Sequence, residues 1–209
     1  METIVLWLSA HSAWMQILSL VTGVTYIIMQ IFQYKWMWHF NLITAAIILI
    51  NAVVNHDATG TWAPLWAQVL FNTYLIIMAV IGIVNWKKLA AQSDGKIHIL
   101  KLSRKIIWIA AGIMLIGAPV ICLLLSLTND PKPVADGIAM TISIVAAWFL
   151  TRSHLEQWHL WIIADIFVIV VYASQAMWGL VALYVFYIIS CCIGIYNWRK
   201  KGVWIEAGE

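Results

Sequence analysis

Charged residues are scarce in this sequence. Lys and Arg together number 12 and Asp and Glu together number 9, so that 10% of the 209 residues are charged while 64% are hydrophobic. A soluble domain carries about 25% charged residues, and the composition therefore excludes an ordinary soluble protein. The chain divides almost entirely into runs of about 20 apolar residues, the length that a helix needs to cross a bilayer. The sequence predicts an integral membrane protein with the lipid bilayer as its surroundings.

Several other signatures are absent. The sequence has no Gly-rich phosphate loop, no His or Cys cluster with metal-ligand spacing and no nucleophile elbow, so we expect no enzyme, no metal site and no cofactor. The net charge of +3 is small and the basic residues group at helix ends, so a nucleic acid is not an expected partner. No Lys or Arg precedes the first apolar run, and a cleaved signal peptide is therefore not expected. The cysteines fall in apolar stretches and are expected to be small core residues: Cys122, Cys191 and Cys192.

Polar breaks divide the chain into seven apolar spans, which predict an all-α fold with seven transmembrane helices in a single domain. Residues 14–86 would form a first three-helix bundle, residues 106–128 a linker helix, and residues 134–198 a second three-helix bundle. The spans lie near residues 14–34, 37–55, 64–86, 106–128, 134–151, 156–174 and 177–198.

The charged residues between the spans predict the orientation. Basic residues occur in alternate breaks and after the last span, and the positive-inside rule places these segments in the cytoplasm. Seven crossings then put the N-terminus outside and the C-terminus inside. Eleven of the 12 Lys and Arg residues follow this pattern, namely Lys35, Lys87, Lys88, Lys96, Lys101, Arg104, Lys105, Arg152, Arg199, Lys200 and Lys201, while Asp57, Asp130 and Asp136 occupy the opposite side.

An internal repeat relates the two bundles. Residues 82–88 read GIVNWKK and residues 194–200 read GIYNWRK, an offset of 112 residues, and Trp66 and Trp178 match at the same offset. A looser match pairs residues 38–41 with residues 158–161. Both copies end at a basic edge, so the repeats would be parallel, with a ligand site near the midplane between them. The alternative is that a Trp followed by lysines is simply a common end for a membrane helix.

One helical face in the sixth span combines aromatic and acidic groups. Trp158, Trp161 and Asp165 are spaced three and four residues apart and therefore share a face. An aromatic wall that ends at a carboxylate suits a cationic aromatic ligand. Alternatively, tryptophans collect at membrane interfaces for reasons of interface chemistry, and Asp165 could bond a hydroxyl group of a neighbouring helix as a purely structural contact.

Amide and hydroxyl side chains lie inside the second and third spans. Asn41, Thr44 and Asn51 fall roughly on one face of the second span, and Gln68 and Asn72 are four residues apart on the third. Each of them alone would more often form a helix-helix hydrogen bond. Together they predict a wettable slot between the bundles, as expected for the pathway of a polar solute.

The stretch SIVAAWFLTRSHLEQWHLWII, residues 143–163, resembles the PnuC family of vitamin transporters. That family has an Arg followed by Glu-x-Trp-x-x-Trp at the start of its sixth helix, which Arg152, Glu156, Trp158 and Trp161 match. Residues 65–86 resemble its third helix, Asn41 matches its second-helix Asn and Tyr184 its seventh-helix Tyr. Two positions depart from the pattern: Asn72 stands where the family often has Gln, and Asp165 where related members have Asn.

The resemblance implies a fold of three plus one plus three helices, like the SWEET sugar transporters, in a homotrimer in the bacterial inner membrane. It implies facilitated diffusion of a vitamin, most simply nicotinamide riboside, by alternating access, with trapping through a cytosolic kinase. Trp158 and Trp161 would stack on the vitamin ring, while Asn41, Asn72 and Tyr184 would hydrogen-bond its polar parts. Asp165 would favour a cation, and Gln68 adds a further polar contact.

Three alternatives remain open at this stage. A thiamine transporter of the same family would also suit Asp165, because thiamine is a cation as well. A small-sugar carrier of the SWEET type shares the repeat plan but depends less on Trp158 and Trp161. A membrane enzyme or a structural subunit would use its polar residues only for assembly.

Overall fold

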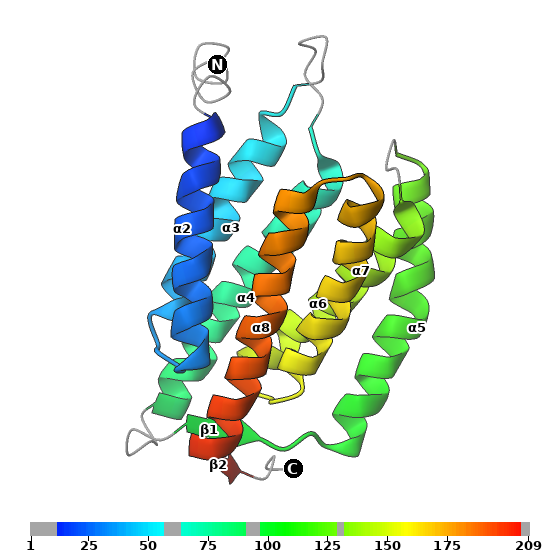
Figure 1. The fold of residues 1–209 in the computed structure, drawn as a ribbon. Helices are drawn as coiled ribbons and strands as arrows, with labels where there is room; N and C mark the ends of the chain where they lie inside the picture. Colours follow the sequence, from blue (N-terminus) through cyan, green and yellow to red (C-terminus); the bar gives the residue numbers. More distant parts are fainter. Residues whose placement is uncertain (1–11, 57–63, 91–96, 129–131, 206–209) are drawn as a thin grey trace. The chain divides into compact units, whose positions relative to one another are not determined.

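The computed structural model describes residues 12–56, 64–90, 97–128 and 132–205 (Figure 1). In this part of the chain it contains seven α-helices, each matching one predicted span to within a few residues. Two short β-strands were not predicted. The elements are α2 (Ser12–Ile31), α3 (Met37–Val53), α4 (Trp66–Ala90), β1 (Ile97–Leu100), α5 (Arg104–Ser126), α6 (Pro133–Thr151), α7 (Gln157–Ser174), α8 (Trp178–Lys201) and β2 (Gly202–Ile205).

The helices carry the surface of a membrane protein. Six of the described helices are long and apolar enough to cross a bilayer, and α3, with 17 residues, is a shorter apolar helix. On α5 only 6% of the span is buried, and Leu115 and Ile116 are 78% and 69% exposed. Water would make such apolar surface costly, whereas lipid chains are as apolar as the side chains. The chain is therefore a multi-pass membrane protein.

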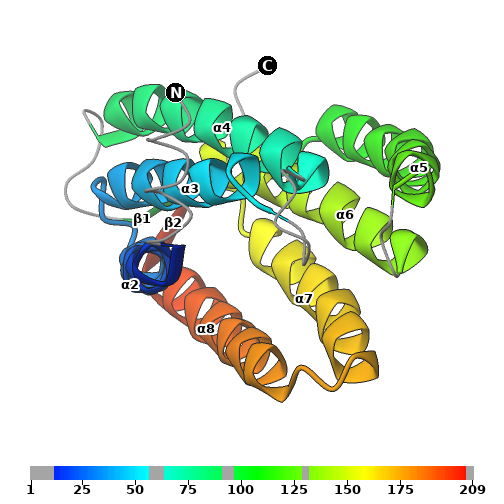
Figure 2. The same cartoon turned by 90° about the horizontal axis from the view of Figure 1, so that it is seen from above.

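The chain divides into two compact units, residues 1–87 and 88–209. In the first unit, here called the first bundle, α3 packs against α2 and α4 (Figure 2). Thr44 on α3 donates a hydrogen bond to Thr22 on α2, with 2.8 Å between the two hydroxyl oxygens. On the other side of α3, the ring of Trp38 contacts Trp86 of α4.

In the second unit, α5 packs on α6, α6 on α7 and α7 on α8 (Figure 2). The helix α6 is the most enclosed of the candidate spans, with 56% of its span buried. Val145 and Phe149 of α6 form a small core with Ala110 of α5. Gly137 permits the close approach of α5 and α6, because a Cβ atom at that position would lie 2.6 Å from the Sγ atom of Cys122. The helices α6, α7 and α8 are called the second bundle below.

The two strands form a parallel pair beside the turn between α6 and α7. Ile97 pairs with Gly202 and Leu100 pairs with Ile205. Ser153, in the turn, has a φ of 58° and donates a hydrogen bond from its hydroxyl to the carbonyl of His98 at 2.6 Å. The ring of His154 bonds the carbonyl of Leu100 at 2.8 Å. Sequence patterns treat residues 87–105 and the tail as polar breaks, because a four-residue strand is too short to show a period.

The cysteines differ from expectation in one case. Cys191 is buried and Cys122 is half-buried, but Cys192 is exposed on the helix surface. Two consecutive helical residues point about 100° apart, so Cys191 and Cys192 cannot both face one core. The prediction that all three are core residues is wrong for Cys192. None of the three forms a disulfide in the described structure.

Candidate functional site

Trp158 is enclosed between α7 and α8. Its side chain is 1% exposed, and its ring meets that of Trp198 edge to face, with centroids 5.6 Å apart and planes at 86°. Gly194 leaves the space for the ring, because a Cβ atom there would lie 2.6 Å from it. The indole N–H of Trp158 is buried and has no hydrogen-bond partner among the described residues. Trp158 therefore fixes the packing of α7 on α8.

The first bundle contains the same contact. Trp38 is 1% exposed and meets Trp86 edge to face, with centroids 5.7 Å apart and planes at 81°. A Cβ atom at Gly82 would overlap the Trp38 ring. The indole N–H of Trp38 is likewise buried without a partner in the described structure. Trp38, Gly82 and Trp86 thus repeat the geometry of their counterparts in the second bundle.

The turns that precede these tryptophans also match. Gln33 and Ser153 adopt positive φ values of 53° and 58°. The next residue donates its backbone N–H to the carbonyl five residues before it, from Tyr34 to Met29 at 2.9 Å and from His154 to Phe149 at 3.1 Å. Corresponding residues are 120 apart in α2–α3 and α6–α7, and 112 apart in α4 and α8. The sequence repeat therefore has a geometric counterpart inside each bundle.

Four candidate site residues fall at corresponding positions of the two bundles. Asn41 and Trp161 are 120 residues apart, and Asn72 and Tyr184 are 112 apart. Asn41 and Trp161 are both half-buried. Asn72 is 4% exposed and donates from Nδ2 to the carbonyl of Gln68 at 2.8 Å. These candidate residues therefore occupy equivalent positions in the two bundles.

Asp165 is a buried carboxylate, 6% exposed, on α7. It lies close enough to Tyr184, Tyr187 and Cys191 of α8 to interact with them electrostatically. A carboxylate inside a membrane span is costly and marks a functional group by default. Asp165 and Tyr184 therefore lie near each other, on α7 and α8 of the same bundle.

Two tyrosines that the sequence analysis did not select complete this group. The ring of Tyr184 lies 5.6 Å from that of Tyr172 and 5.4 Å from that of Tyr187. Helical spacing could have identified both, because Tyr172 follows Asp165 by seven residues and Tyr187 follows Tyr184 by three. Asp165 with Tyr172, Tyr184 and Tyr187 is called the acidic tyrosine group below. It places a carboxyl group and aromatic ring faces within one bundle.

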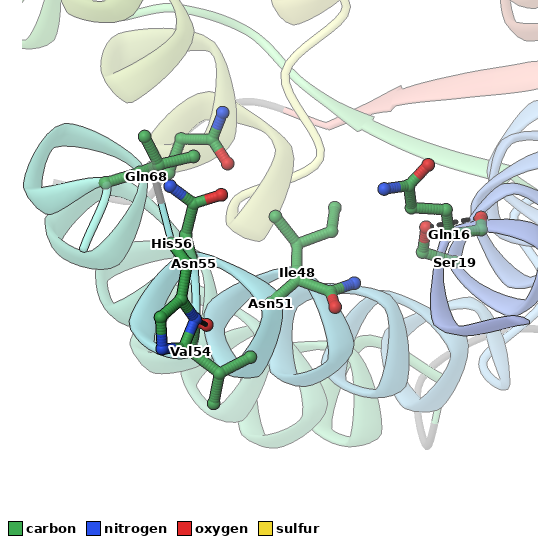
Figure 3. Close-up of a pocket in the computed structure, with 10 residues that line it drawn as sticks. Gln16, Ser19, Ile48, Asn51, Val54, Asn55, His56 and Gln68 are labelled. Carbon is green, nitrogen blue, oxygen red and sulfur yellow. Dashed lines mark hydrogen bonds between the residues drawn. The ribbon is translucent and has the colours of Figure 1, made fainter. Parts of the chain in front are cut away.

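The remaining polar candidates lie in the first bundle. Thr44 donates both to Thr22 and to the carbonyl of Phe40, so it serves as a helix-helix contact. Gln68 is exposed and lines a pocket of about 440 Å³ together with Asn51 (Figure 3). In the described ranges, no group of three or more His, Cys, Asp or Glu side chains is arranged to hold a metal ion.

His154 is the buried titratable group outside the membrane spans. It is 0% exposed in the turn between α6 and α7. Burial lowers the pKa of its imidazole, against the opposing effects of the hydrogen bond to the carbonyl of Leu100 and of Glu156. Since a carbonyl only accepts, the neutral ring carries its proton on Nδ1, and the buried Nε2 atom has no partner in the described structure.

The fold and these residues define an α-helical multi-pass membrane protein with an acidic aromatic group inside a helix bundle. The sequence profile of the family described as "Nicotinamide mononucleotide transporter" matches residues 13–200. The chain belongs to this family of membrane transporters.

Individual relatives agree with this assignment. The chain is 26% identical over 170 residues to the nicotinamide riboside transporter PnuC of Escherichia coli (strain K12), covering 69% of each chain. It is 25% identical over 149 residues to the protein of the same name from Neisseria mucosa, covering 65% of this chain and 56% of that one. A crystal structure of the vitamin B3 transporter PnuC has the same fold, with a TM-score of 0.68 and 20% identity over 90% of this chain and 81% of that chain.

Proposed function

We propose that this protein carries nicotinamide riboside across the inner membrane of a bacterium. The observation that carries the proposal is the family match over residues 13–200, together with relatives that are named nicotinamide riboside transporters. The acidic tyrosine group agrees with it chemically. The nicotinamide ring of the riboside is a pyridinium cation, and a carboxylate with aromatic faces attracts such a ring.

The proposed architecture is a pair of parallel repeats, residues 14–86 and 134–198, joined by a linker helix at residues 106–128, as in the SWEET fold. The support is the shared frame of the two bundles: the same edge-to-face tryptophans, the same glycine beneath the ring and the same positive-φ turn. Corresponding residues are 120 apart in α2–α3 and α6–α7 and 112 apart in α4 and α8, so the correspondence extends over three helices of each bundle. A chance helix ending would not repeat all of these features.

The residues proposed to contact the substrate follow from this frame. Trp161 stacks on the pyridinium ring and Asp165 compensates its charge, while Trp158, which is 1% exposed, supports the site by holding α7 against α8. Asn41, Asn72 and Tyr184 hydrogen-bond the carboxamide and the ribose, and Gln68 contacts the substrate from the pocket that it lines with Asn51. Trp161 has the freer ring, because it is half-buried whereas Trp158 is held against Trp198. We therefore expect Trp161 to contribute most of the stacking interaction with the substrate.

Transport is proposed to be facilitated diffusion by alternating access, without ion coupling, in a homotrimer. Phosphorylation by a cytosolic kinase would trap the riboside after entry and keep the gradient inward. These steps rest on the family resemblance.

The proposed orientation places the N-terminus outside and the C-terminus in the cytoplasm. Within each bundle most of the described basic residues gather at one end: Lys35 and Lys87 in the first, and Arg152 with the last turn of α8 in the second, whereas Lys132 lies at the start of α6. The positive-inside rule assigns both ends to the cytoplasm. A reporter fused after Glu209 that is active only in the periplasm would contradict this orientation.

A thermal-shift screen of the full-length protein against nicotinamide riboside, thiamine and riboflavin tests the substrate. A ligand that binds only the folded state raises the melting temperature in step with its affinity. We expect the largest shift with nicotinamide riboside. A larger shift with thiamine would move the assignment to a thiamine transporter, and a shift with glucose but with no vitamin would indicate a sugar carrier.

A further inference from the structure

A polar pocket (Figure 3) lies where α3 ends and α4 begins. This is the end of the first bundle opposite the Trp38–Trp86 contact, which joins the start of α3 to the end of α4. Its volume is about 440 Å³, which is within the range of about 300–1,000 Å³ typical of ligand sites. All three helices of this bundle contribute. The polar lining residues are Gln16 and Ser19 from α2, Asn51 from α3, Asn55 and His56 just after it, and Gln68 from α4.

The pocket is a feature of the first bundle and does not follow from the repeat. At the offsets of 120 and 112, the counterparts of Asn51 and Gln68 are Val171 and Leu180, so the second bundle has apolar side chains at both positions. The link between α3 and α4 covers residues 54–65, whereas the link between α7 and α8 covers only residues 175–177. Asn55 and His56, which line the pocket, belong to the longer link.

One side chain in the pocket has an unmet hydrogen-bonding need. The Oδ1 atom of Asn51 is buried and accepts no hydrogen bond from the described residues. Leaving a buried acceptor without a partner is unfavourable. A ligand with a donor placed against Oδ1 would supply the missing bond, so Asn51 marks a position at which the pocket can bind a donor group.

The lining selects the chemistry of that occupant. Its polar groups are amides, a hydroxyl and an imidazole, and none of the lining residues that the structure describes is an acid, a lysine or an arginine. The carbonyl of Val54 accepts from Nδ1 of His56 at 2.8 Å, which leaves the lone pair of Nε2 as a further acceptor. Neutral donors and acceptors side by side suit hydroxyl groups, because each hydroxyl both donates and accepts. Among the described residues, no carboxylate lines the pocket for a pyridinium cation.

We propose that this pocket binds ribose, as a second substrate-recognition site separate from the acidic tyrosine group of the second bundle. The proposal extends the proposed function: in the proposed orientation the pocket is at the outer end of the first bundle, where an arriving riboside meets the protein first. The ribose part is then recognised by the first bundle itself. The pocket thereby provides selection for a ribosylated substrate over the free base.

The test uses free D-ribose as the probe, so that it is independent of transport. Saturation-transfer NMR is recorded on the full-length protein in a detergent without a sugar headgroup, because glycosidic detergents would compete for the same hydroxyl-binding groups. Asn51→Leu and Gln16→Leu each remove one lining amide at similar volume. Gln175→Leu is the matched control, since it removes an exposed amide at the corresponding end of the second bundle. Trp161→Ala removes a proposed ring contact and leaves the pocket intact.

The expected result is a ribose signal that the wild type, Gln175→Leu and Trp161→Ala retain and that Asn51→Leu and Gln16→Leu lose, at unchanged melting temperatures. If Asn51→Leu fails to fold, Gln16→Leu decides the matter, because Gln16 is exposed on α2. If the wild type gave no ribose signal, or if the folded pocket variants retained it, the proposal that this pocket binds ribose would be overturned. The proposed function is tested separately, by the thermal shifts of the wild-type protein with the vitamins and by its exchange of riboside.

Discussion

The indole ring of Trp158 stands edge to face against that of Trp198, with 5.6 Å between their centroids, and Trp38 and Trp86 repeat this relationship at 5.7 Å. An edge-to-face pair contributes about 0.5–1.5 kcal/mol beyond the burial of its area. Two bundles built around the same pair indicate that the contact is a structural element of the repeat. Trp158 lies about one helical turn before Trp161, so its contact with Trp198 also fixes the position of the half-buried Trp161 ring.

The glycine beneath each indole provides the first prediction. Gly194→Ala places a methyl group 2.6 Å from the Trp158 ring, and Gly82→Ala overlaps the Trp38 ring. Overpacking of this kind costs about 1–3 kcal/mol. We expect both variants to unfold at lower temperature or lower denaturant concentration than the wild type, as measured by thermal or chemical unfolding in detergent.

Two other glycines are the controls for this prediction. A Cβ atom at Gly179, on the same helix as Gly194, or at Gly112 on α5 would meet nothing within 4 Å. Alanine favours a helix over glycine by roughly 1 kcal/mol, so Gly179→Ala and Gly112→Ala should be neutral or stabilising. If all four variants lost stability equally, the close approach of glycine and indole would not be the cause.

The two tryptophans of the Trp-x-x-Trp pattern should separate stability from binding. Trp158→Ala empties a fully enclosed position and is expected to cost about 3–5 kcal/mol of stability. Trp161→Ala removes a half-buried ring and should leave the melting temperature nearly unchanged while affinity for nicotinamide riboside falls about tenfold, because a ring stacked on a cation contributes up to about 2 kcal/mol. Calorimetric titration of both variants measures this; full affinity in Trp161→Ala would remove it from the site.

Asp165 should act on charge and not on shape. Asp165→Asn keeps the volume of the side chain and removes its ability to carry a negative charge, so the cations nicotinamide riboside and thiamine should bind more weakly. Riboflavin, which is neutral, should be unaffected. Competition binding with the three vitamins tests this, and equal losses for all three would show that Asp165 has a structural role.

His154 should make stability depend on pH. Its pKa is lowered in the folded protein, mainly by burial, from an ordinary value of about 6.5. Above pH of about 6.5 the ring is neutral in both states and contributes no pH dependence. As the pH falls below that value, the unfolded state binds a proton that the folded state refuses, so the free energy of unfolding decreases until the pH passes the folded pKa.

His154→Gln should remove this part of the acid sensitivity, because glutamine does not titrate. His159→Gln, which changes an exposed histidine five residues away, is the matched control and should keep the wild-type pH dependence. Melting temperatures at about pH 7.5 and about pH 5.5 provide the comparison. A His154→Gln variant whose melting temperature falls as far as that of the wild type would assign the acid sensitivity to other groups.

Hydrophobic spans and basic clusters were sufficient to place all seven helices, because a bilayer imposes a length and a charge rule that a single sequence displays. The sequence spacing also predicted that Trp158 and Asp165 share a helical face, and both side chains are buried. The contact between Trp158 and Gly194 could not be predicted, because these two residues are 36 positions apart in the sequence. The pairing of β1 with β2 was also missed. A segment of four residues is too short to show an alternation of apolar and polar side chains, and its hydrogen-bond partners lie in distant segments of the chain.

The pocket of the first bundle shows the same limit. Asn51 and Gln68 were recognisable as polar residues in apolar spans, but Gln16 and Ser19 lie near a helix end, where polar side chains are ordinary. Only the packing of α2, α3 and α4 brings these four residues to one cavity. At the corresponding positions of the second bundle, Val171 and Leu180 stand where the first bundle has Asn51 and Gln68.

Exchange of labelled nicotinamide riboside in proteoliposomes tests the central claim most directly. Liposomes containing the protein and loaded with unlabelled riboside should take up labelled riboside from outside, with saturation and without any ion gradient, and Trp161→Ala should slow this exchange. Absence of riboside exchange by the folded wild-type protein, while labelled thiamine or glucose does exchange, would contradict the account.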